Sequence, residues 1–260
     1  MNIVVCVKQI PDPAMPGQLD PATKTLKREG KLIMDESDSF GVEMGLQLAE
    51  KAGGGEVTIV SMVPSSGVQG IRQALAMGAA KAILVSDDSL SGTDALGTAK
   101  VLAAAIKRAG EVDLVLTATE STDGYTGTVP AQVAELLGWP SLTFARAVDI
   151  ADGTIRIERQ TEKGYNEVEA SLPAVVSVTA GVVEPRYPSF KGIMAAKNKP
   201  LEEVSVADLG VDAGQVGWGG ARQEITDVRQ AEAREAGEKI EDEGDAHEKI
   251  VAFLEQLKVI

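Results

Sequence analysis

The sequence predicts an α/β fold of the doubly wound type, a parallel sheet with helices on both faces, followed by a β-hairpin region and a C-terminal arm. Short apolar runs rich in β-branched residues alternate with stretches whose apolar residues recur at helical spacing. Runs that are apolar on both faces are typical of buried parallel strands. At 260 residues, roughly 70–75% of the unfolded surface can be buried, which is enough for a large core.

Four apolar runs predict the first strands, and a helical stretch follows each of them. The strands are residues 2–7, 56–62, 82–86 and 112–117. Each helix is indicated by apolar residues that share one face. These faces are Val42, Leu46 and Ala49; Val68, Ile71 and Leu75; Leu102, Ala105 and Ile106; and Val133, Leu136 and Leu137.

The residues at the ends of these stretches are of the types that begin and end helices. Ser, Thr and Asp side chains accept hydrogen bonds from the first free N–H groups, and Gly adopts the left-handed conformation that closes a helix. The first three helices are predicted to start at Asp38, at Ser66, and at Thr93 or Asp94, and Pro130 lies in the first turn of the fourth. The predicted helix ends are Gly78, Gly110 and Gly138.

The pattern changes after residue 140. Alternating residues on either side of Asp152-Gly153 predict a β-hairpin, and a second turn at 162–164 leads into a further strand. Residues 173–178 are another apolar strand, and an irregular basic stretch follows at 184–200. The chain then becomes charged and rich in Ala and Gly, which indicates an arm. We therefore expect an α/β domain of residues 1–200, with a hairpin region at 146–171, and an arm at 201–260 that ends in a short helix.

Composition excludes several functions. A formal net charge of −14 argues against binding to nucleic acid or to an anionic membrane, which needs a basic face. No apolar run approaches the ~18 residues of a spanning helix, so no membrane insertion is expected. The single cysteine indicates a cytoplasmic protein. The single histidine, His247, argues against a Ser-His-Asp nucleophile and a multi-histidine metal site.

The loop at 117–130, between a predicted strand and a predicted helix, is the richest candidate site. Gly124 and Gly127 permit close backbone approach, several hydroxyls flank them, and the next helix begins with free N–H groups. These features suit a phosphate. An ordinary polar loop with Thr128 as the helix N-cap is an equally good interpretation of the residues alone. The P-loop and G-x-G-x-x-G patterns are both missing.

Two other segments have competing interpretations. The run Asp35-Glu36-Ser37-Asp38 could contact a ribose or an adenine, but the segment alone favours a helix cap with dipole compensation. Cys6 is expected to be a buried, unreactive thiol. Lys8 could approach a nucleotide or pair with a surface carboxylate.

Residues 184–197 mix prolines, basic residues and apolar residues within an acidic protein. A basic and apolar loop of this kind suggests a docking surface for another protein. A loop that packs onto its own domain explains the same pattern equally well.

Several short motifs together resemble one family, the electron transfer flavoprotein β subunits. The segments are LPAVVSV at 172–178, EPRYPS at 184–189, GIMAAK at 192–197, VCVKQIPD at 5–12, RQALAMGA at 72–79 and STDG at 121–124. Each match is modest, but their order is specific, and the resemblance covers nearly the whole chain. It implies a nucleotide-binding domain of the adenine nucleotide hydrolase-like fold.

The resemblance also implies a function. A β subunit pairs with an α subunit that carries FAD. The heterodimer accepts electrons from donor dehydrogenases, such as the acyl-CoA dehydrogenases of fatty acid β-oxidation, and passes them to a quinone-linked oxidoreductase. The β subunit does no bond chemistry and is not an enzyme. It holds AMP in most members and a second FAD in the electron-bifurcating branch.

Matching motifs carry the family's site residues onto this chain. The nucleotide-binding residues would be Cys6, Asp35, Glu36, Ser37, Asp38, Met62, Ala118, Thr119, Glu120, Ser121, Thr122, Asp123, Gly124, Tyr125, Thr126, Gly127, Thr128 and Val129. Residues 178–200 would form a partner-recognition loop, with contacts from Glu184, Arg186, Tyr187, Phe190, Ile193 and Met194. The C-terminal arm would contact the α subunit.

The chain departs from the family pattern at three places. Phe190 replaces the usual Leu anchor, and Gln160 stands where several members have an acid that holds the flavin domain. The loop at 122–128 differs from that of the bifurcating branch, so we expect AMP. The alternatives are a second FAD and a stand-alone adenine-nucleotide-binding regulatory protein, which would not explain residues 184–197 or the arm.

Overall fold

The computed structural model describes residues 1–260 except 16, 29, 65–66, 230–236 and 238. The chain forms two compact units, Met1–Ile225 and Thr226–Ile260. The first unit runs past the boundary predicted after residue 200, because β11 (Leu201–Val204) is an edge strand of the main sheet. Its pairing with β5 (Lys81–Val85) keeps this part of the chain on the domain.

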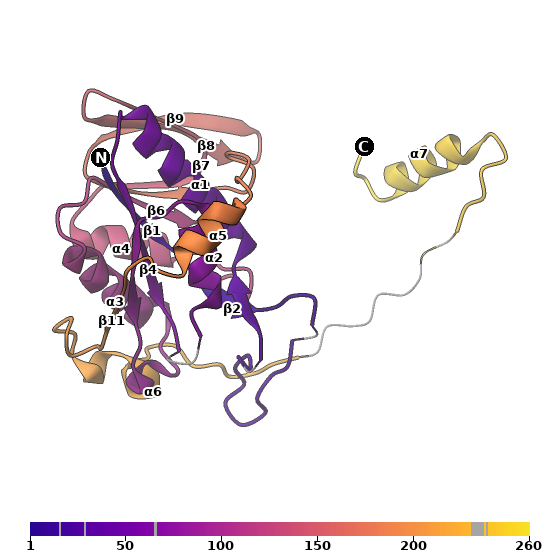
Figure 1. The fold of residues 1–260 in the computed structure, drawn as a ribbon. Coiled ribbons are helices and arrows are strands. Elements are labelled where there is room, and N and C mark those ends of the chain that lie inside the picture. Colours follow the sequence, from indigo (N-terminus) through magenta and orange to yellow (C-terminus); the bar gives the residue numbers. More distant parts are fainter. Residues whose placement is uncertain (16, 29, 65–66, 230–236, 238) are drawn as a thin grey trace. The chain divides into compact units, whose positions relative to one another are not determined.

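Among the described residues, nine strands form one sheet in the order β11-β5-β4-β1-β6-β10-β7-β8-β9 (Figure 1). Neighbours from β11 to β7 are parallel, whereas β7, β8 and β9 form antiparallel hairpins. The remaining bounds are β1 (Asn2–Cys6), β4 (Glu56–Met62), β6 (Leu114–Ala118), β7 (Ser141–Ala151), β8 (Thr154–Thr161), β9 (Gly164–Ser171) and β10 (Ala174–Val178). The predicted strands and both predicted hairpin turns are thus confirmed.

Helices cover both faces of the sheet, which confirms the doubly wound class. One apolar core contains residues of α1 (Glu36–Lys51), α2 (Gln69–Met77) and α5 (Phe190–Ala196). The other contains residues of α3 (Ala95–Arg108) and α4 (Val129–Leu137). β1 separates them, because Ile3 and Val5 belong to the first core and Val4 and Cys6 to the second.

The topology fixes where a ligand can bind. From β1 the sheet grows through β4 and β5 on one side and through β6 and β10 on the other. The strand order therefore reverses beside β1. Doubly wound sheets open a crevice at this switch point, beyond the carboxyl ends of the strands.

The helix ends follow most of the sequence signals. Asp94 caps α3, and Gly138 closes α4 in the left-handed conformation, as predicted. The prediction of Asp38 as the cap of α1 is wrong, since Asp35 holds that position and Asp38 lies in the first turn. The predicted cap Ser66 lies outside the described residues. Val68 is the N-cap of α2.

Two segments are more regular than predicted. Residues after β1 form β2 (Gln9–Pro11), which pairs antiparallel with β3 (Leu32–Met34). The stretch predicted to be irregular at 184–200 contains α5, whose N-cap Ser189 accepts a hydrogen bond from Gly192 N at 3.0 Å. Sequence patterns easily miss a short helix, because its cap and its tertiary contacts stabilise it rather than a periodic apolar face.

Short elements complete the described structure: η1 (Asp88–Leu90), η2 (Ala213–Gln215), α6 (Gly217–Gly220) and α7 (Ala246–Gln256). α7 lies in the second unit, and none of its residues is buried. Several of its apolar residues, including Ile250, Val251 and Phe253, are exposed. The described helices include none with the length and apolar character needed to cross a membrane.

Candidate functional site

A cleft of about 730 Å³ opens at the carboxyl ends of β1, β4, β5 and β6. Among the residues predicted to bind a nucleotide, those that line it are Cys6, Asp38, Met62, Ala118, Glu120, Ser121, Thr126, Gly127 and Val129. The others lie outside its lining: Asp35, Glu36, Ser37, Thr119, Thr122, Asp123, Gly124, Tyr125 and Thr128. Several of this second group shape the cleft instead.

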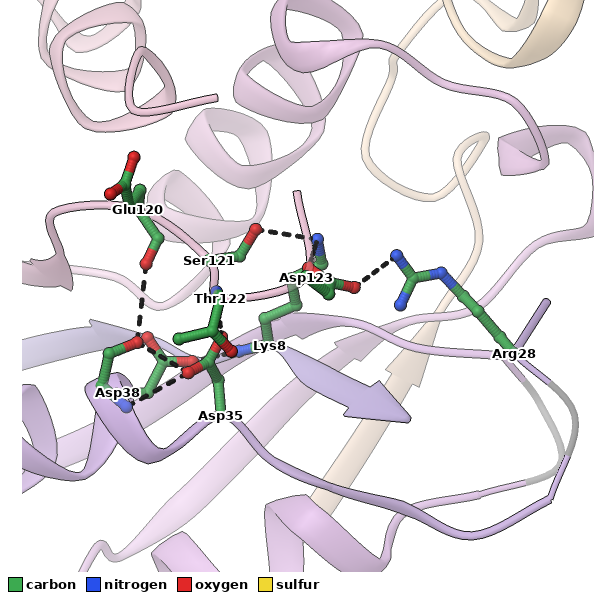
Figure 2. Close-up of polar contacts among 9 residues, drawn as sticks. Lys8, Arg28, Asp35, Asp38, Glu120, Ser121, Thr122 and Asp123 are labelled. Atoms are coloured by element: carbon green, nitrogen blue, oxygen red, sulfur yellow. Dashed lines mark hydrogen bonds and ion pairs between the residues drawn. The ribbon is translucent and has the colours of Figure 1, made fainter. Parts of the chain in front are cut away.

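Asp35 joins α1 to the loop after β6 (Figure 2). One carboxylate oxygen accepts from Ser37 N at 3.1 Å and from Ser37 Oγ at 2.7 Å. The other accepts from Thr122 N at 2.7 Å and from Thr122 Oγ1 at 3.0 Å. Because Asp35 is fully buried and its oxygens are occupied by the protein, it is a helix cap and a loop anchor. This agrees with the interpretation that the segment alone favoured.

Asp38 lies one turn further along α1 and does line the cleft. Its Oδ2 accepts from Lys8 N at 2.6 Å. Burial raises the pKa of the Asp38 carboxyl well above its usual range, although the hydrogen bond from Lys8 opposes this shift. Asp38 is therefore a buried carboxyl that faces the cleft beside a backbone donor.

Two cations converge on one carboxylate at the rim of the cleft (Figure 2). Lys8 Nζ lies 2.6 Å from Asp123 Oδ1, and Arg28 Nη2 lies 2.6 Å from Asp123 Oδ2. Burial alone would raise the pKa of Asp123, but the hydrogen bond and charge of Lys8 and the charge of Arg28 lower it overall. Lys8 and Arg28 both line the cleft, and their two positive charges exceed the one negative charge of Asp123 between them. The rest of the lining includes the acidic residues Asp87, Asp88, Asp94 and Glu120.

The start of α4 provides free donors beside this charge. Thr128 is the N-cap, as predicted, but its side chain makes no cap hydrogen bond. Gly127 is left-handed, with φ of 67°, and Thr128 follows in the right-handed region. This alternation turns successive N–H groups toward an anion. The exposed Glu120 carboxylate lies next to Gly127, and as a hydrogen-bond acceptor it suits sugar hydroxyls rather than a phosphate.

Cys6 lines the cleft as an unreactive thiol. It is buried, and burial, with a smaller effect from the charge of Asp38, raises its pKa to about 12. A thiol with this pKa is almost never ionised at neutral pH. Cys6 thus contributes shape rather than nucleophilic chemistry.

One side of the cleft, formed by the loop after β5 and by Trp218, was not predicted from the sequence. The loop after β5 is fastened by Asp94, which accepts from Gly97 N at 2.8 Å and from Arg222 N at 2.7 Å. Trp218 packs so closely on Gly92 that a Cβ there would lie 2.2 Å from its ring. Arg28, which follows a stretch rich in Pro and Gly, was missed as well. No local pattern marks Arg28 or Trp218, because the fold alone brings them to the cleft.

The predicted recognition segment presents apolar side chains around α5. Tyr187 is 94% exposed and Phe190 is 82% exposed, and Ile193 and Met194 are about half exposed. We call these four residues the α5 patch. Glu184 is also exposed. A cluster of exposed large apolar side chains is typical of a surface that meets another protein.

Arg186 holds this segment on the domain. Its Nε lies 2.7 Å from Glu43 Oε2 and its Nη1 lies 2.9 Å from Glu50 Oε1, both on α1. Burial favours a raised pKa at Glu43, but the hydrogen bonds from Arg186 and Gln47 lower it overall. The same pairs raise the pKa of Arg186. Arg186 therefore positions the α5 patch through contacts within the chain.

The fold and the cleft define the class as doubly wound α/β proteins with a ligand cleft at the switch point. The family model for the electron transfer flavoprotein domain matches residues 23–209. Electron transfer flavoprotein subunit beta of Mycobacterium tuberculosis is 42% identical over 264 residues, which cover 100% of this chain and 99% of that protein.

Two further relatives widen the comparison. Electron transfer flavoprotein subunit beta of Megasphaera elsdenii is 32% identical over 96% of this chain and 95% of that protein. The caffeyl-CoA reductase-Etf complex subunit CarD of Acetobacterium woodii is 34% identical over 92% of both. The chain belongs to the electron transfer flavoprotein β-subunit family, as its motifs predict.

The buried carboxyl of Asp38 predicts a pH-dependent stability. Its pKa is raised in the folded chain, so its favourable contribution is complete below the ordinary carboxyl pKa and is lost as pH rises through the folded value. Asp38→Asn removes this titration. As pH rises from about 4 to about 8, the free energy of unfolding of the variant should therefore increase relative to that of the wild type.

Urea unfolding of both proteins at several pH values measures this difference. Glu36→Gln removes an exposed carboxylate from the same helical turn and controls for the loss of one negative charge. A wild-type-to-variant difference that stays constant across the pH range would contradict the prediction.

Proposed function

We propose that this chain is the β subunit of a heterodimeric electron transfer flavoprotein. The heterodimer takes electrons from dehydrogenases, such as the acyl-CoA dehydrogenases of fatty acid β-oxidation, and delivers them to a quinone-linked oxidoreductase. The FAD held mainly by the α subunit supplies the redox chemistry. Full-length similarity to named β subunits supports this role. The buried single thiol is consistent with a cytoplasmic location.

The ligand of this chain is AMP in our proposal, and its function is structural. The observation that carries it is the cleft at the switch point, where free N–H groups of α4 meet Lys8 and Arg28. A phosphate suits this place because a helix N-terminus attracts an anion and the side chains of Lys8 and Arg28 line the same cleft. Glu120 suits the ribose hydroxyls. The residues present thus fit an adenine mononucleotide.

Two other surfaces of the protein bind its partner proteins. The α5 patch docks a donor dehydrogenase, with Phe190 as the apolar anchor, and Arg186 keeps the patch in place. The second unit, Thr226–Ile260, contacts the α subunit through the exposed apolar residues of α7. Separate surfaces allow the heterodimer to stay assembled while donors exchange.

A second candidate is a β subunit that holds a second FAD in place of AMP. One observation favours it, since the cleft continues beyond the start of α4 to the loop after β5 and to Trp218. The relative CarD belongs to a complex named for a caffeyl-CoA reductase. A stand-alone adenine-nucleotide-binding protein fits less well, because it would need neither the α5 patch nor the C-terminal unit.

Nucleotide analysis tests the ligand assignment. The chain is co-expressed with its candidate α partner, and the purified complex is denatured. Released AMP and FAD are then quantified by chromatography. One AMP and one FAD per heterodimer is the expected result. Two FAD without AMP would assign the complex to the second candidate, and a stable nucleotide-bound homodimer would favour the stand-alone protein.

Phe190→Ala tests the docking surface. Truncating a central apolar anchor should lower the second-order rate constant for flavin reduction by the dehydrogenase about tenfold, with unchanged flavin content. Leu136→Ala, which truncates a partly exposed apolar residue of α4, is the matched control. Stopped-flow reduction measures both variants. Equal rate constants for wild type and Phe190→Ala would refute the anchor role.

A further inference from the structure

The helix α5 has little apolar contact with the domain that carries it. It has seven residues, and a helix of this length is not stable by itself in water. Ala196 is the one buried residue of this described helix, whereas Phe190, Ile193 and Met194 are exposed. Contacts other than apolar burial therefore fix the position of α5.

Two cationic side chains join the C-terminal ends of α2 and α5 in a reciprocal way. From α2, Arg72 Nη1 donates to Ala196 O at 2.6 Å and to Lys199 O at 3.3 Å. From the turn after α5, Lys199 Nζ donates to Leu75 O at 2.9 Å and to Ala79 O at 2.6 Å. Each segment thus supplies the donor for carbonyl groups at the end of the other. We call these four hydrogen bonds the α2–α5 contacts.

The last carbonyl groups of a helix have no partner within the helix and lie at the negative end of its dipole, so a nearby cation stabilises them. Within the described helices, neither α2 nor α5 has a basic residue in its own last turn. Burial lowers the pKa of the Lys199 amine, because the charged form loses water. The two carbonyl groups replace part of that water. Lys199 is therefore directed toward its own domain rather than toward solvent.

The backbone of α5 also lies directly on the last turn of α2. A Cβ at Gly192 would lie 2.5 Å from Ala76 O, which is far closer than atoms can approach without a shift. Gly192 therefore permits a close contact between the two helices that no other residue type would allow. The α2–α5 contacts act across this close approach, so a change at either place should move α5 away from α2.

We propose that Arg72 and Lys199 are positioning residues for the docking of the donor dehydrogenase, because they hold α5 on α2 and so present the α5 patch in a fixed arrangement. This inference rests on the proposed docking function of the patch. A surface that is ordered before binding loses less conformational freedom when the complex forms. Since Arg186 fastens the chain before α5 to α1, the helix is held on both sides.

Lys199→Met tests the proposal because it keeps an unbranched side chain and removes the donor. In the heterodimer, amide hydrogen exchange in α5 should become about fivefold faster. With an acyl-CoA dehydrogenase as donor, the KM for the heterodimer should rise about fivefold while kcat stays unchanged, since ordering α5 then falls to the binding step. Lys199→Arg can still donate to both carbonyl groups and should restore both values. Lys107→Met removes an exposed lysine from the last turn of α3 and should change neither.

Gly192→Ala is a second test that changes no charge. Alanine favours a helix more than glycine does, so docking should improve if the helix content of α5 were the limiting factor. The added Cβ points at Ala76 O within the chain and should displace α5 from α2. We therefore expect a KM that rises about fivefold, as in Lys199→Met. The flavin content of every variant shows whether the heterodimer has assembled.

The outcomes separate this inference from the proposed function. A wild-type kcat/KM in Phe190→Ala overturns the docking function of the α5 patch. A lowered kcat/KM in Phe190→Ala together with a wild-type KM in Lys199→Met overturns only the positioning role. A raised KM in Lys199→Met with unchanged hydrogen exchange in α5 would mean that the lysine charge itself meets the dehydrogenase, which also contradicts that role.

Discussion

The carboxylate of Asp35 joins the first turn of α1 to the loop after β6, and the shape of the cleft depends on this contact. It accepts hydrogen bonds from both the backbone and the hydroxyl of Ser37 and of Thr122. A buried carboxylate is costly unless its oxygens are bonded, so the two donor residues have little freedom to move apart. The loop that carries Asp123 and Gly127 is thereby held beside β1.

The same helix links the cleft to the α5 patch. Asp35 fixes the start of α1, and Glu43 and Glu50 further along hold Arg186. Bidentate contacts between a guanidinium and a carboxylate fix orientation as well as distance. The cleft and the α5 patch are therefore both held by one helix, α1. In our account the nucleotide takes no part in redox chemistry, and this arrangement gives it a structural function.

Periodicity and turn residues sufficed to predict the parallel strands, the hairpin at Asp152-Gly153, and the presence of a cleft-forming loop region beyond the strand ends. They could not separate residues that line the cleft from residues that shape it. Asp35 and Asp38 are the same residue type in one short segment, but Asp35 is the N-cap that bonds to Ser37 and Thr122, whereas Asp38 lies in the first turn and lines the cleft. Arg28 and Trp218 reach the cleft through long-range packing that no local pattern records. The helix α5 was missed because its stability comes from its cap Ser189 and from contacts with α2, while Arg186 holds the segment before it on α1.

The most direct test of this account is amide hydrogen exchange in Asp35→Ala. The Thr122 amide donates to Asp35, so its protection should fall about tenfold or more, and neighbouring amides of the loop should follow. Asp94→Ala removes the corresponding cap of α3 and should leave the Thr122 amide protected. Unchanged protection of Thr122 in Asp35→Ala would contradict the claim that this carboxylate holds the cleft together.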